Sequence, residues 1–210
     1  MSSAGYWKRR GLVLVVSAPS GAGKRTILSH VQRRDPKLVY AVSATTRPPR
    51  KDEVDGLDYH FLEEEIFLAQ RDAGAFAEWA EVHGNYYGTP LADLKRLIAT
   101  GKDVLVEVDV QGMRQLRGAS LDIVSVFIMP PSLEELEARL KRRGENTPAD
   151  QAVRLQNARE ELAARFEYDY IVVNRVLEDA VGDIEAIVRA ERCRANRINK
   201  DLETDENVIS

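Results

Sequence analysis

A glycine-rich stretch near the N-terminus carries residues suited to binding phosphate. Gly21, Gly23 and Lys24 follow an apolar run at residues 12–16 and precede a segment typical of a helix start. Glycine has no Cβ, so the backbone can turn its N–H groups inward around an anion. The N-terminus of the following helix adds partial positive charge. This order of strand, turn and helix predicts a phosphate-binding loop whose lysine reaches the outer phosphates of a nucleotide.

The stretch departs from the strict pattern G-x-x-x-x-G-K-[ST] at two positions. Ala18 stands at the first glycine, which costs little if its φ is negative. Arg25 stands at the Ser or Thr whose hydroxyl normally ligates Mg²⁺, and Thr26 faces another direction on a helix. The alternative is a Gly/Ser-rich turn that binds nothing, but the flanking strand and helix favour the phosphate loop.

Length and charge narrow the class of protein. The chain has 210 residues and a formal net charge of -4, enough for one α/β domain with a buried core. The charge balance gives no support to binding nucleic acid or membranes. The single cysteine, Cys193, cannot form an intrachain disulfide, and the first apolar run is too short to cross a bilayer. We therefore expect a cytoplasmic protein without a signal peptide or membrane segment.

Hydrophobic patterning predicts an α/β fold, a P-loop NTPase-like parallel sheet flanked by helices. Continuous apolar runs predict buried strands at residues 11–17, 39–43, 104–109, 123–129 and 169–173. Helical patterns occupy residues 26–34, 91–100, 132–143, the segment after a polar break at 144–150 to about 166, and 177 to about 197. Between residues 44 and 89, two alternating strands at 58–61 and 76–82 surround a helix at 63–73, which predicts a small α+β insertion.

Two arginines in a proline-rich segment are spaced to hold an anion. Arg47 and Arg50 lie where prolines prevent regular structure, near the hydroxyls of Ser43, Thr45 and Thr46. Two rigidly placed guanidiniums form a bidentate anion clamp. The alternative is a solvated basic turn, but the upstream phosphate loop favours the clamp. Further phenol donors follow along the chain, namely Tyr59, Tyr86 and Tyr87.

Two carboxylates predict selectivity for a base. Glu78 interrupts an apolar strand, and Asp109 is expected to end a strand of the main sheet. A carboxylate in a pocket accepts paired hydrogen bonds from guanine N1–H and its N2 amino group. Adenine offers an acceptor at N1 instead, and the resulting mismatch leaves a buried polar group unpaired. The alternative for Glu78 is a strand residue facing water, which period-2 alternation alone favours.

Several segments match, in order, the motifs of one known family. They are residues 17–24 (SAPSGAGK), 43–50 (SATTRPPR), 53–59 (EVDGLDY), 78–80 (EWA), 84–89 (GNYYGT), 109–112 (DVQG) and 139–144 (RLKRRG). On these segments the chain resembles guanylate kinases, which transfer a phosphoryl group from ATP to GMP, over nearly its whole length.

The resemblance implies a role for individual residues. ATP would contact Ala18, Pro19, Ser20, Gly21, Ala22, Gly23, Lys24, Arg25, Thr26 and Asn174. GMP would contact Ser43, Arg47, Arg50, Glu53, Tyr59, Glu78, Tyr87, Thr89 and Asp109, of which Glu78, Thr89 and Asp109 would bind guanine. The charge that develops during transfer would be stabilised by Lys24, Arg47, Arg143 and Arg154.

The resemblance also implies a division into moving parts. A core of residues 11–43, 90–143 and 167–200 would carry a GMP-binding insertion at 44–89 and a lid at 144–166, and the acidic tail at 201–210 is expected to fray. Closure over both nucleotides would exclude water while GMP attacks the γ-phosphorus in line, with Mg²⁺ as the cofactor of ATP. No direct protein ligand for the metal is assigned.

Two other functions stay open at this point. The first is phosphorylation of a different nucleoside monophosphate or small phosphate acceptor. The second is a catalytically weak or silent guanylate-kinase-like module that binds protein partners, although this chain keeps Gly21, Gly23 and Lys24. The sequence also leaves a homo-oligomer open.

The arginine at position 25 leads to a prediction about the metal. An Arg25→Ser variant restores the hydroxyl and removes a nearby cation, so we expect it to show a higher apparent Mg²⁺ affinity than the parent protein. Titration of ATP-dependent turnover with graded Mg²⁺ measures the two affinities. Coincident titration curves would contradict the prediction.

Overall fold

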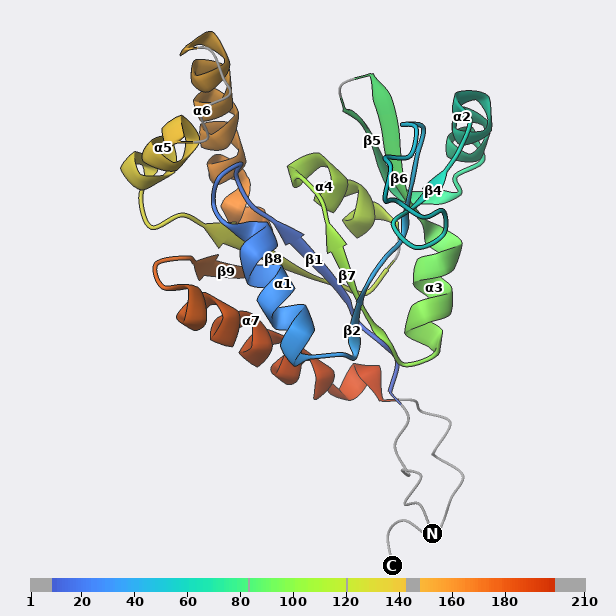
Figure 1. The fold of residues 1–210 in the computed structure, drawn as a ribbon. Coiled ribbons are helices and arrows are strands. Elements are labelled where there is room, and N and C mark those ends of the chain that lie inside the picture. Colours follow the sequence, from blue (N-terminus) through green and yellow to red (C-terminus); the bar gives the residue numbers. More distant parts are fainter. Residues whose placement is uncertain (1–8, 83, 120, 143–147, 199–210) are drawn as a thin grey trace, which may run out of the picture.

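The central sheet is a five-stranded parallel sheet. The computed structural model describes residues 9–82, 84–119, 121–142 and 148–198. Three expectations therefore fall outside the described residues: Arg143, the lid start at 144–147 and the tail at 201–210. The strands run in the order β2-β7-β1-β8-β9 (Figure 1). Their bounds are β1 Val13–Ser17, β2 Leu38–Tyr40, β7 Asp103–Glu107, β8 Ile123–Met129 and β9 Tyr170–Val173.

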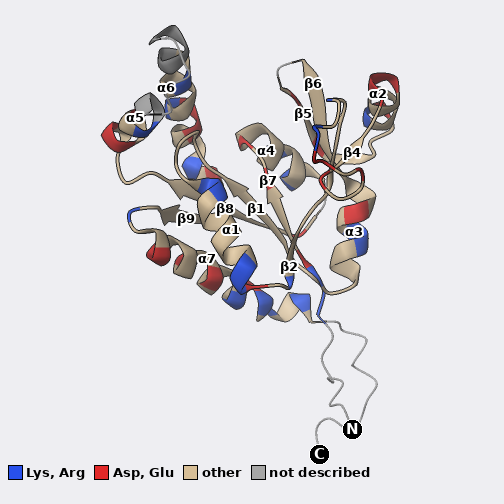
Figure 2. Ribbon diagram, viewed as in Figure 1, with Lys and Arg blue, Asp and Glu red and all other residues tan. Residues whose placement is uncertain are grey.

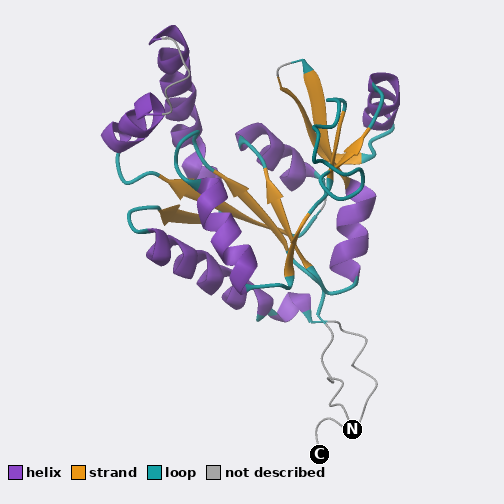
Figure 3. Cartoon of the chain, viewed as in Figure 1, coloured by secondary structure: helices purple, strands orange, loops and turns teal. Residues whose placement is uncertain are grey.

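Helices cover both faces of this sheet, as continuous apolar strands require. On one face, α1 (Lys24–Arg34) and α7 (Leu177–Arg192) pack on the core through residues such as Ile27, Val31 and Ile184. On the other face, α3 (Leu91–Ala99) and α4 (Val110–Gly118) contribute Leu94, Met113 and Leu116. Figure 3 shows the helices on the two sides of the strands. None of the helices in the described part of the chain is long and apolar enough to cross a membrane.

A second sheet of four strands stands apart from the first, in the order β4-β3-β6-β5. Its elements are β3 Ser43–Thr45, β4 Tyr59–Phe61, α2 Glu64–Asp72, β5 Phe76–Val82 and β6 Asn85–Pro90. It has its own small apolar cluster, in which the rings of Phe67 and Phe76 stack with centroids 4.4 Å apart. The sheet runs from Ser43 to Pro90, one residue beyond each end of the expected insertion at 44–89.

Two helices rise beside the phosphate loop on the other side of the molecule. Helix α5 (Leu133–Arg142) and helix α6 (Pro148–Ala163) form an arm that faces the insertion across the carboxyl ends of the strands (Figure 1). Buried Leu136 and Ala158 pack against each other between them. Helix α6 continues into the 3₁₀ turn Ala164–Glu167, which leads to β9. Figure 2 shows charges of both signs along α5, α6 and α7.

The structure corrects four sequence-based expectations. The strand expected at 39–43 is two strands, β2 and β3, which belong to different sheets. Helix α4 was not expected, because Gly112 and Gly118 weaken its helical signal. Strand β6 was not expected either, because it contains Gly88 and Pro90. The last helix ends at Arg192 rather than near 197, where a separate 3₁₀ turn follows.

A buried carboxylate ties the two ends of the described chain to the central sheet. Asp103 is fully buried at the start of β7 and accepts hydrogen bonds from Arg9 (2.6 and 2.7 Å), from the Leu12 N–H (3.0 Å) and from Arg192 (2.7 Å). Burial alone would raise the pKa of this carboxyl, but the hydrogen bonds outweigh it and lower the pKa. Beside this network, an isolated antiparallel bridge joins Arg9 to Ile198.

We expect an Asp103→Asn variant to lower the free energy of unfolding by about 3 kcal/mol at neutral pH, because two guanidiniums lose their shared anion. A carboxylate with a lowered folded pKa stabilises the protein above its unfolded pKa of about 3.9, and that contribution is lost as the pH falls through the folded pKa. The difference between variant and parent should therefore shrink in acid. Denaturant unfolding at about pH 7 and pH 3 measures it.

The exposed Asp52 provides the matched control, since an Asp52→Asn change should have little effect at either pH. A stability difference for Asp103→Asn that is the same at both pH values would contradict the assignment.

Candidate active site

The phosphate loop has the backbone that its sequence predicts. Gly21 and Gly23 adopt φ values of 89° and 90°, the left-handed region that side chains disfavour. The Ala22 N–H donates to the Pro19 carbonyl at 3.0 Å and closes the turn. Gly23 directly precedes α1, so the loop and the helix N-terminus share one concave surface.

Asn174 contacts this loop directly. Its Nδ2 donates a hydrogen bond to the Ala22 carbonyl at 2.8 Å. A Cβ added to Gly23 would lie 2.5 Å from the same nitrogen, so the close approach requires glycine. The sequence assigned Asn174 to the ATP site. In the structure its side chain contacts the backbone of the phosphate loop. Asn174 therefore positions the loop from the segment that follows β9.

A carboxylate that the sequence did not assign lies between the loop and the sheet. The Glu107 Oε2 is 3.7 Å from the Lys24 Nζ, and its Oε1 accepts a hydrogen bond from the Tyr40 hydroxyl at 2.8 Å. Burial, followed by the charge of Glu107, raises the pKa of Tyr40 well above its ordinary value. The signal available in the sequence was the acidic end of an otherwise apolar strand.

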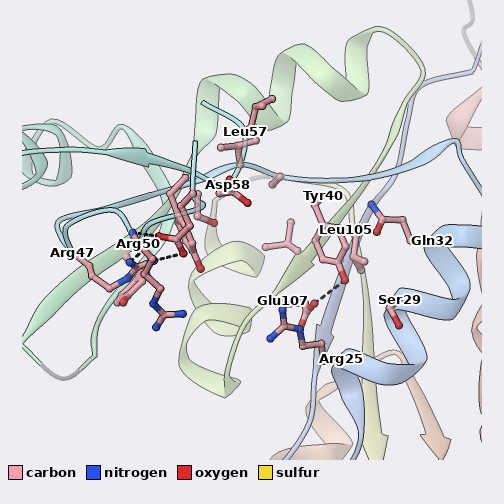
Figure 4. A pocket seen from close by; sticks show the side chains of 17 residues that line it. Arg25, Ser29, Gln32, Tyr40, Arg47, Arg50, Leu57, Asp58, Leu105 and Glu107 are labelled. Carbon is pink, nitrogen blue, oxygen red and sulfur yellow. Dashed lines mark hydrogen bonds and ion pairs between the residues drawn. The ribbon is translucent and has the colours of Figure 1, made fainter. Parts of the chain in front are cut away.

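A cleft of about 710 Å³ separates α1 and β7 from the insertion (Figure 4). The insertion lines it with residues that the sequence assigned to GMP, namely Ser43, Arg47, Arg50, Glu53, Tyr59 and Tyr87. The sequence placed these residues together, and the structure brings them to one cavity. Arg25, Ser29 and Gln32 line the same cavity from α1.

Glu53 holds the first arginine of the clamp in place. Arg47 donates two hydrogen bonds to its carboxylate, at 2.8 and 2.9 Å, and the Arg50 backbone N–H donates a third at 2.7 Å. These hydrogen bonds lower the pKa of Glu53, which stays ionised. The Arg47 guanidinium also lies 5.5 Å from the ring centre of Tyr59. Glu53, expected to contact GMP, thus contacts the clamp that would bind it.

Two of the residues predicted to bind the base lie side by side on the small sheet, although neither lines the cleft described above. Glu78 on β5 pairs in register with Thr89 on β6, and both side chains are buried. The Thr89 hydroxyl donates to the Glu78 Oε1 and lies 3.5 Å from the Ser43 hydroxyl. Burial, together with the nearby charge of Asp109, raises the pKa of Glu78. Glu78 is therefore not the water-facing strand residue that alternation alone favours.

Asp109 lies beside this pocket, but not at the end of a strand as expected. Strand β7 ends at Glu107, and Asp109 is the N-cap of α4, where its Oδ1 accepts the Gly112 N–H at 2.8 Å. A Cβ on Gly112 would lie 3.2 Å from the Glu78 Oε2, so α4 packs closely against the pocket. Asp109 thus lies near Glu78 and also caps a helix that the sequence did not predict.

The arm lies close to the phosphate loop. A second cavity, of about 470 Å³, runs between Asp109 on one side and Asn157 and Glu161 of α6 on the other. Burial and the charge of Asp109 raise the pKa of Glu161, whereas Lys24 and the Ser20 backbone act in the opposite direction. The sequence did not single out Glu161. Arg154 lies exposed on the same helix, and Arg143 falls outside the described residues.

The residues around the loop do not form a metal site made of protein ligands alone. The position of the coordinating hydroxyl is Arg25, and a guanidinium has no lone pair to offer a cation. Among the described residues, no group of three or more His, Cys, Asp or Glu side chains could hold a metal ion. A Mg²⁺ ion that arrives with ATP would be coordinated mainly by phosphate oxygens and water.

Comparison with known proteins identifies the family of the chain. The family model of guanylate kinase matches residues 9–191. The chain is 50% identical over 196 residues to a guanylate kinase of Aromatoleum aromaticum, covering 92% of this chain and 95% of that protein. It is 49% identical over 191 residues to a guanylate kinase of a Chelativorans species, covering 90% and 88%.

A solved structure gives the same result for the fold. The crystal structure of guanylate kinase from Anaplasma phagocytophilum superposes with a TM-score of 0.71 at 34% sequence identity, over 94% of this chain and 96% of that one. The phosphate loop, the arginine clamp and the acidic pocket thus occur in a chain that matches this family along nearly all of its length. The chain belongs to the guanylate kinase family.

Proposed function

We propose that the protein transfers the γ-phosphoryl group of ATP to GMP, giving ADP and GDP, and that dGMP is also an acceptor. The observation that carries the proposal is the buried pair of Glu78 and Thr89, which lies in the insertion across from the phosphate loop. One surface suits a polyphosphate and the other suits a guanine base. A phosphotransferase for guanine nucleotides requires both.

The donor side of the site consists of backbone amides and one cation. In the proposal, the ATP phosphates accept hydrogen bonds from the backbone N–H groups of the loop and the N-terminus of α1, where Gly21 and Gly23 have positive φ. Lys24 adds a point charge. Its Nζ lies 3.7 Å from the Glu107 Oε2, and this ion pair holds the lysine near the loop. In the proposal, Arg154 and Arg143 reach the transferring group from the arm when it closes.

The acceptor side binds the base through hydrogen bonds of matched direction. Thr89 donates to one oxygen of Glu78, which leaves lone pairs of that carboxylate for guanine N1–H and its N2 amino group. Asp109 supplies a second carboxylate near the same pocket. Adenine would place its N1 lone pair against Glu78 and leave both groups unpaired. The proposed site therefore selects guanine because binding adenine would leave a buried carboxylate unpaired.

The transfer itself needs positioning and charge rather than covalent catalysis. A GMP phosphate oxygen attacks the γ-phosphorus in line, and the bond from that phosphorus to the β-γ bridging oxygen breaks. Lys24 and Arg47 stabilise the charge on the donor and acceptor sides, and closure of the arm excludes water that would otherwise accept the phosphoryl group. Bound Mg²⁺ would supply further charge neutralisation on ATP. We place the reaction in the cytoplasm, consistent with the single free cysteine, Cys193.

Removal of the loop lysine tests whether the protein is an enzyme at all. We expect Lys24→Ala to lower ATP-dependent GDP formation by at least about 100-fold, because the donor phosphates lose their cation. A coupled assay of ADP release with GMP, dGMP, AMP, UMP and dTMP measures turnover, with Lys95→Ala on the exposed face of α3 as control. A parent protein that converts none of these acceptors would support a silent binding module instead.

Replacement of the buried acid tests the base selectivity. We expect Glu78→Gln to lower kcat/KM for GMP by about 100-fold and to narrow the preference for GMP over AMP, because an amide accepts only one of the two guanine N–H groups well. The exposed Glu81 of the same strand provides the control variant Glu81→Gln. A parent enzyme that prefers AMP would contradict the assignment.

The same residue predicts a pH dependence. Since burial raises the pKa of Glu78, its carboxylate becomes protonated at a higher pH than an ordinary glutamate, whose pKa is about 4.3. The kcat/KM of the parent enzyme for GMP should therefore decline on the acid side above that value, and Glu78→Gln should lack this decline. An identical acid limb in both proteins would assign the titration to another group.

A further inference from the structure

The Arg25 side chain lines the cleft between α1 and the insertion, although its backbone lies in the first turn of α1, next to the phosphate loop. Arg25, Ser29 and Gln32 are spaced i, i+4 and i+7, so they form one stripe along α1. All three line the cleft of about 710 Å³. Figure 4 shows Arg25 reaching from α1 to a position beside Glu107, with Arg47 and Arg50 on the other side of the cleft.

The Arg25 guanidinium is exposed in this position. Within the described part of the chain it makes no ion pair, although its charge reaches the Tyr40 hydroxyl and favours the ionised phenol. Glu107, which lies beside it in Figure 4, accepts the Tyr40 hydroxyl at 2.8 Å and lies 3.7 Å from the Lys24 ammonium. A guanidinium with five donors therefore lines the cleft without an ion pair to any described residue.

The opposite wall presents a second cation of the same kind. Arg47 is neutralised by its two hydrogen bonds to Glu53, but Arg50 makes no ion pair among the described residues. Two unpaired guanidiniums that line one cleft repel each other unless an anion lies between them. An anion with oxygens on several sides, such as a phosphate, would accept hydrogen bonds from both walls.

We propose that Arg25 binds the phosphate of GMP from the α1 side of the cleft, opposite Arg50, and is a third guanidinium of the acceptor site. The inference rests on the proposed function, since it takes GMP as the acceptor. Lys24 and Arg25 then bind the donor and the acceptor phosphates from consecutive positions of one helix. The arginine that replaces a metal-binding hydroxyl thus acts on the other substrate.

This geometry has a consequence for the chemistry. The attacking oxygen belongs to the phosphate that Arg25 contacts, and the phosphate that it attacks is held by the neighbouring Lys24. Because both residues begin α1, their separation is fixed by the helix backbone rather than by domain closure. The repulsion between two phosphate groups would be offset on this side of the cleft by adjacent positive charges.

Binding measurements with an uncharged variant test the proposal. We expect Arg25→Gln to weaken GMP binding about tenfold in calorimetric titrations without ATP or Mg²⁺. Binding of guanosine, which has no phosphate, should be unchanged, as should binding of ATP without Mg²⁺. Arg25→Lys, which keeps the charge but loses the planar fork, should bind GMP with intermediate affinity.

A matched control lies on the same helix. Arg33 is exposed near the C-terminal end of α1 and does not line the cleft, so Arg33→Gln should bind GMP as the parent does. Unfolding curves of all variants show whether the fold is retained. A folded Arg25→Gln variant that loses ATP affinity while its GMP affinity is unchanged would place Arg25 in the donor site and overturn the proposal. Equal weakening of GMP and guanosine binding would overturn it too, because the effect would not depend on the phosphate.

Turnover of the parent protein distinguishes a failure of the role proposed for Arg25 from a failure of the proposed function. GDP formation by the parent, together with unchanged GMP binding by Arg25→Gln, would overturn the role of Arg25 and leave the proposed function intact. A parent that neither binds GMP nor forms GDP would overturn both.

Discussion

The parallel pairing of β1 with β7 is the constraint on which the site depends. Val16 pairs with Glu107, so the chain leaves both strands at the same level and at the same edge of the sheet. The phosphate loop follows β1, the acidic residue Glu107 ends β7, and Asp109 follows it. Parallel strands bring their carboxyl ends together, which is why ligands of open α/β sheets bind there. In the proposed function, both substrates therefore meet at one edge of a sheet that is otherwise buried.

The proposed selectivity for guanine depends on an antiparallel pair of strands in the second sheet. The antiparallel register of β5 and β6 sets Glu78 beside Thr89. The rings of Phe67 and Phe76 stack in the apolar cluster of the same sheet. Gly88 is required there because an added Cβ would lie 3.0 Å from the Phe76 ring. Glu78 is itself buried, and burial is the main cause of its raised pKa. The small sheet therefore carries both an apolar cluster and the carboxylate proposed to bind the base.

Most of the fold followed from local sequence signals, whereas the roles of individual site residues came from the family resemblance. The failures have physical causes. The loop at Gly21 and Gly23 and the strands of the main sheet were predictable because their patterns are local. Helix α4 and strand β6 were not, because Gly112 and Gly88 serve tertiary contacts that a local pattern does not contain. The second role of Asp109 depended on the missed helix. Glu107 and Tyr40 were missed because their hydrogen bond joins strands 67 residues apart.

The bridge between Arg9 and Ile198, with the Asp103 network beside it, bears on how the protein unfolds. It fastens the segment before β1 to the segment after α7, so the five-stranded sheet and its covering helices open as one cooperative unit. The insertion joins this unit through the segment after β2 and at Pro90, and the arm joins it through the segments after β8 and before β9. Amide hydrogens of both appendages should exchange with solvent through local opening, well before those of the central strands, so that substrate binding can reorganise them without loosening the body.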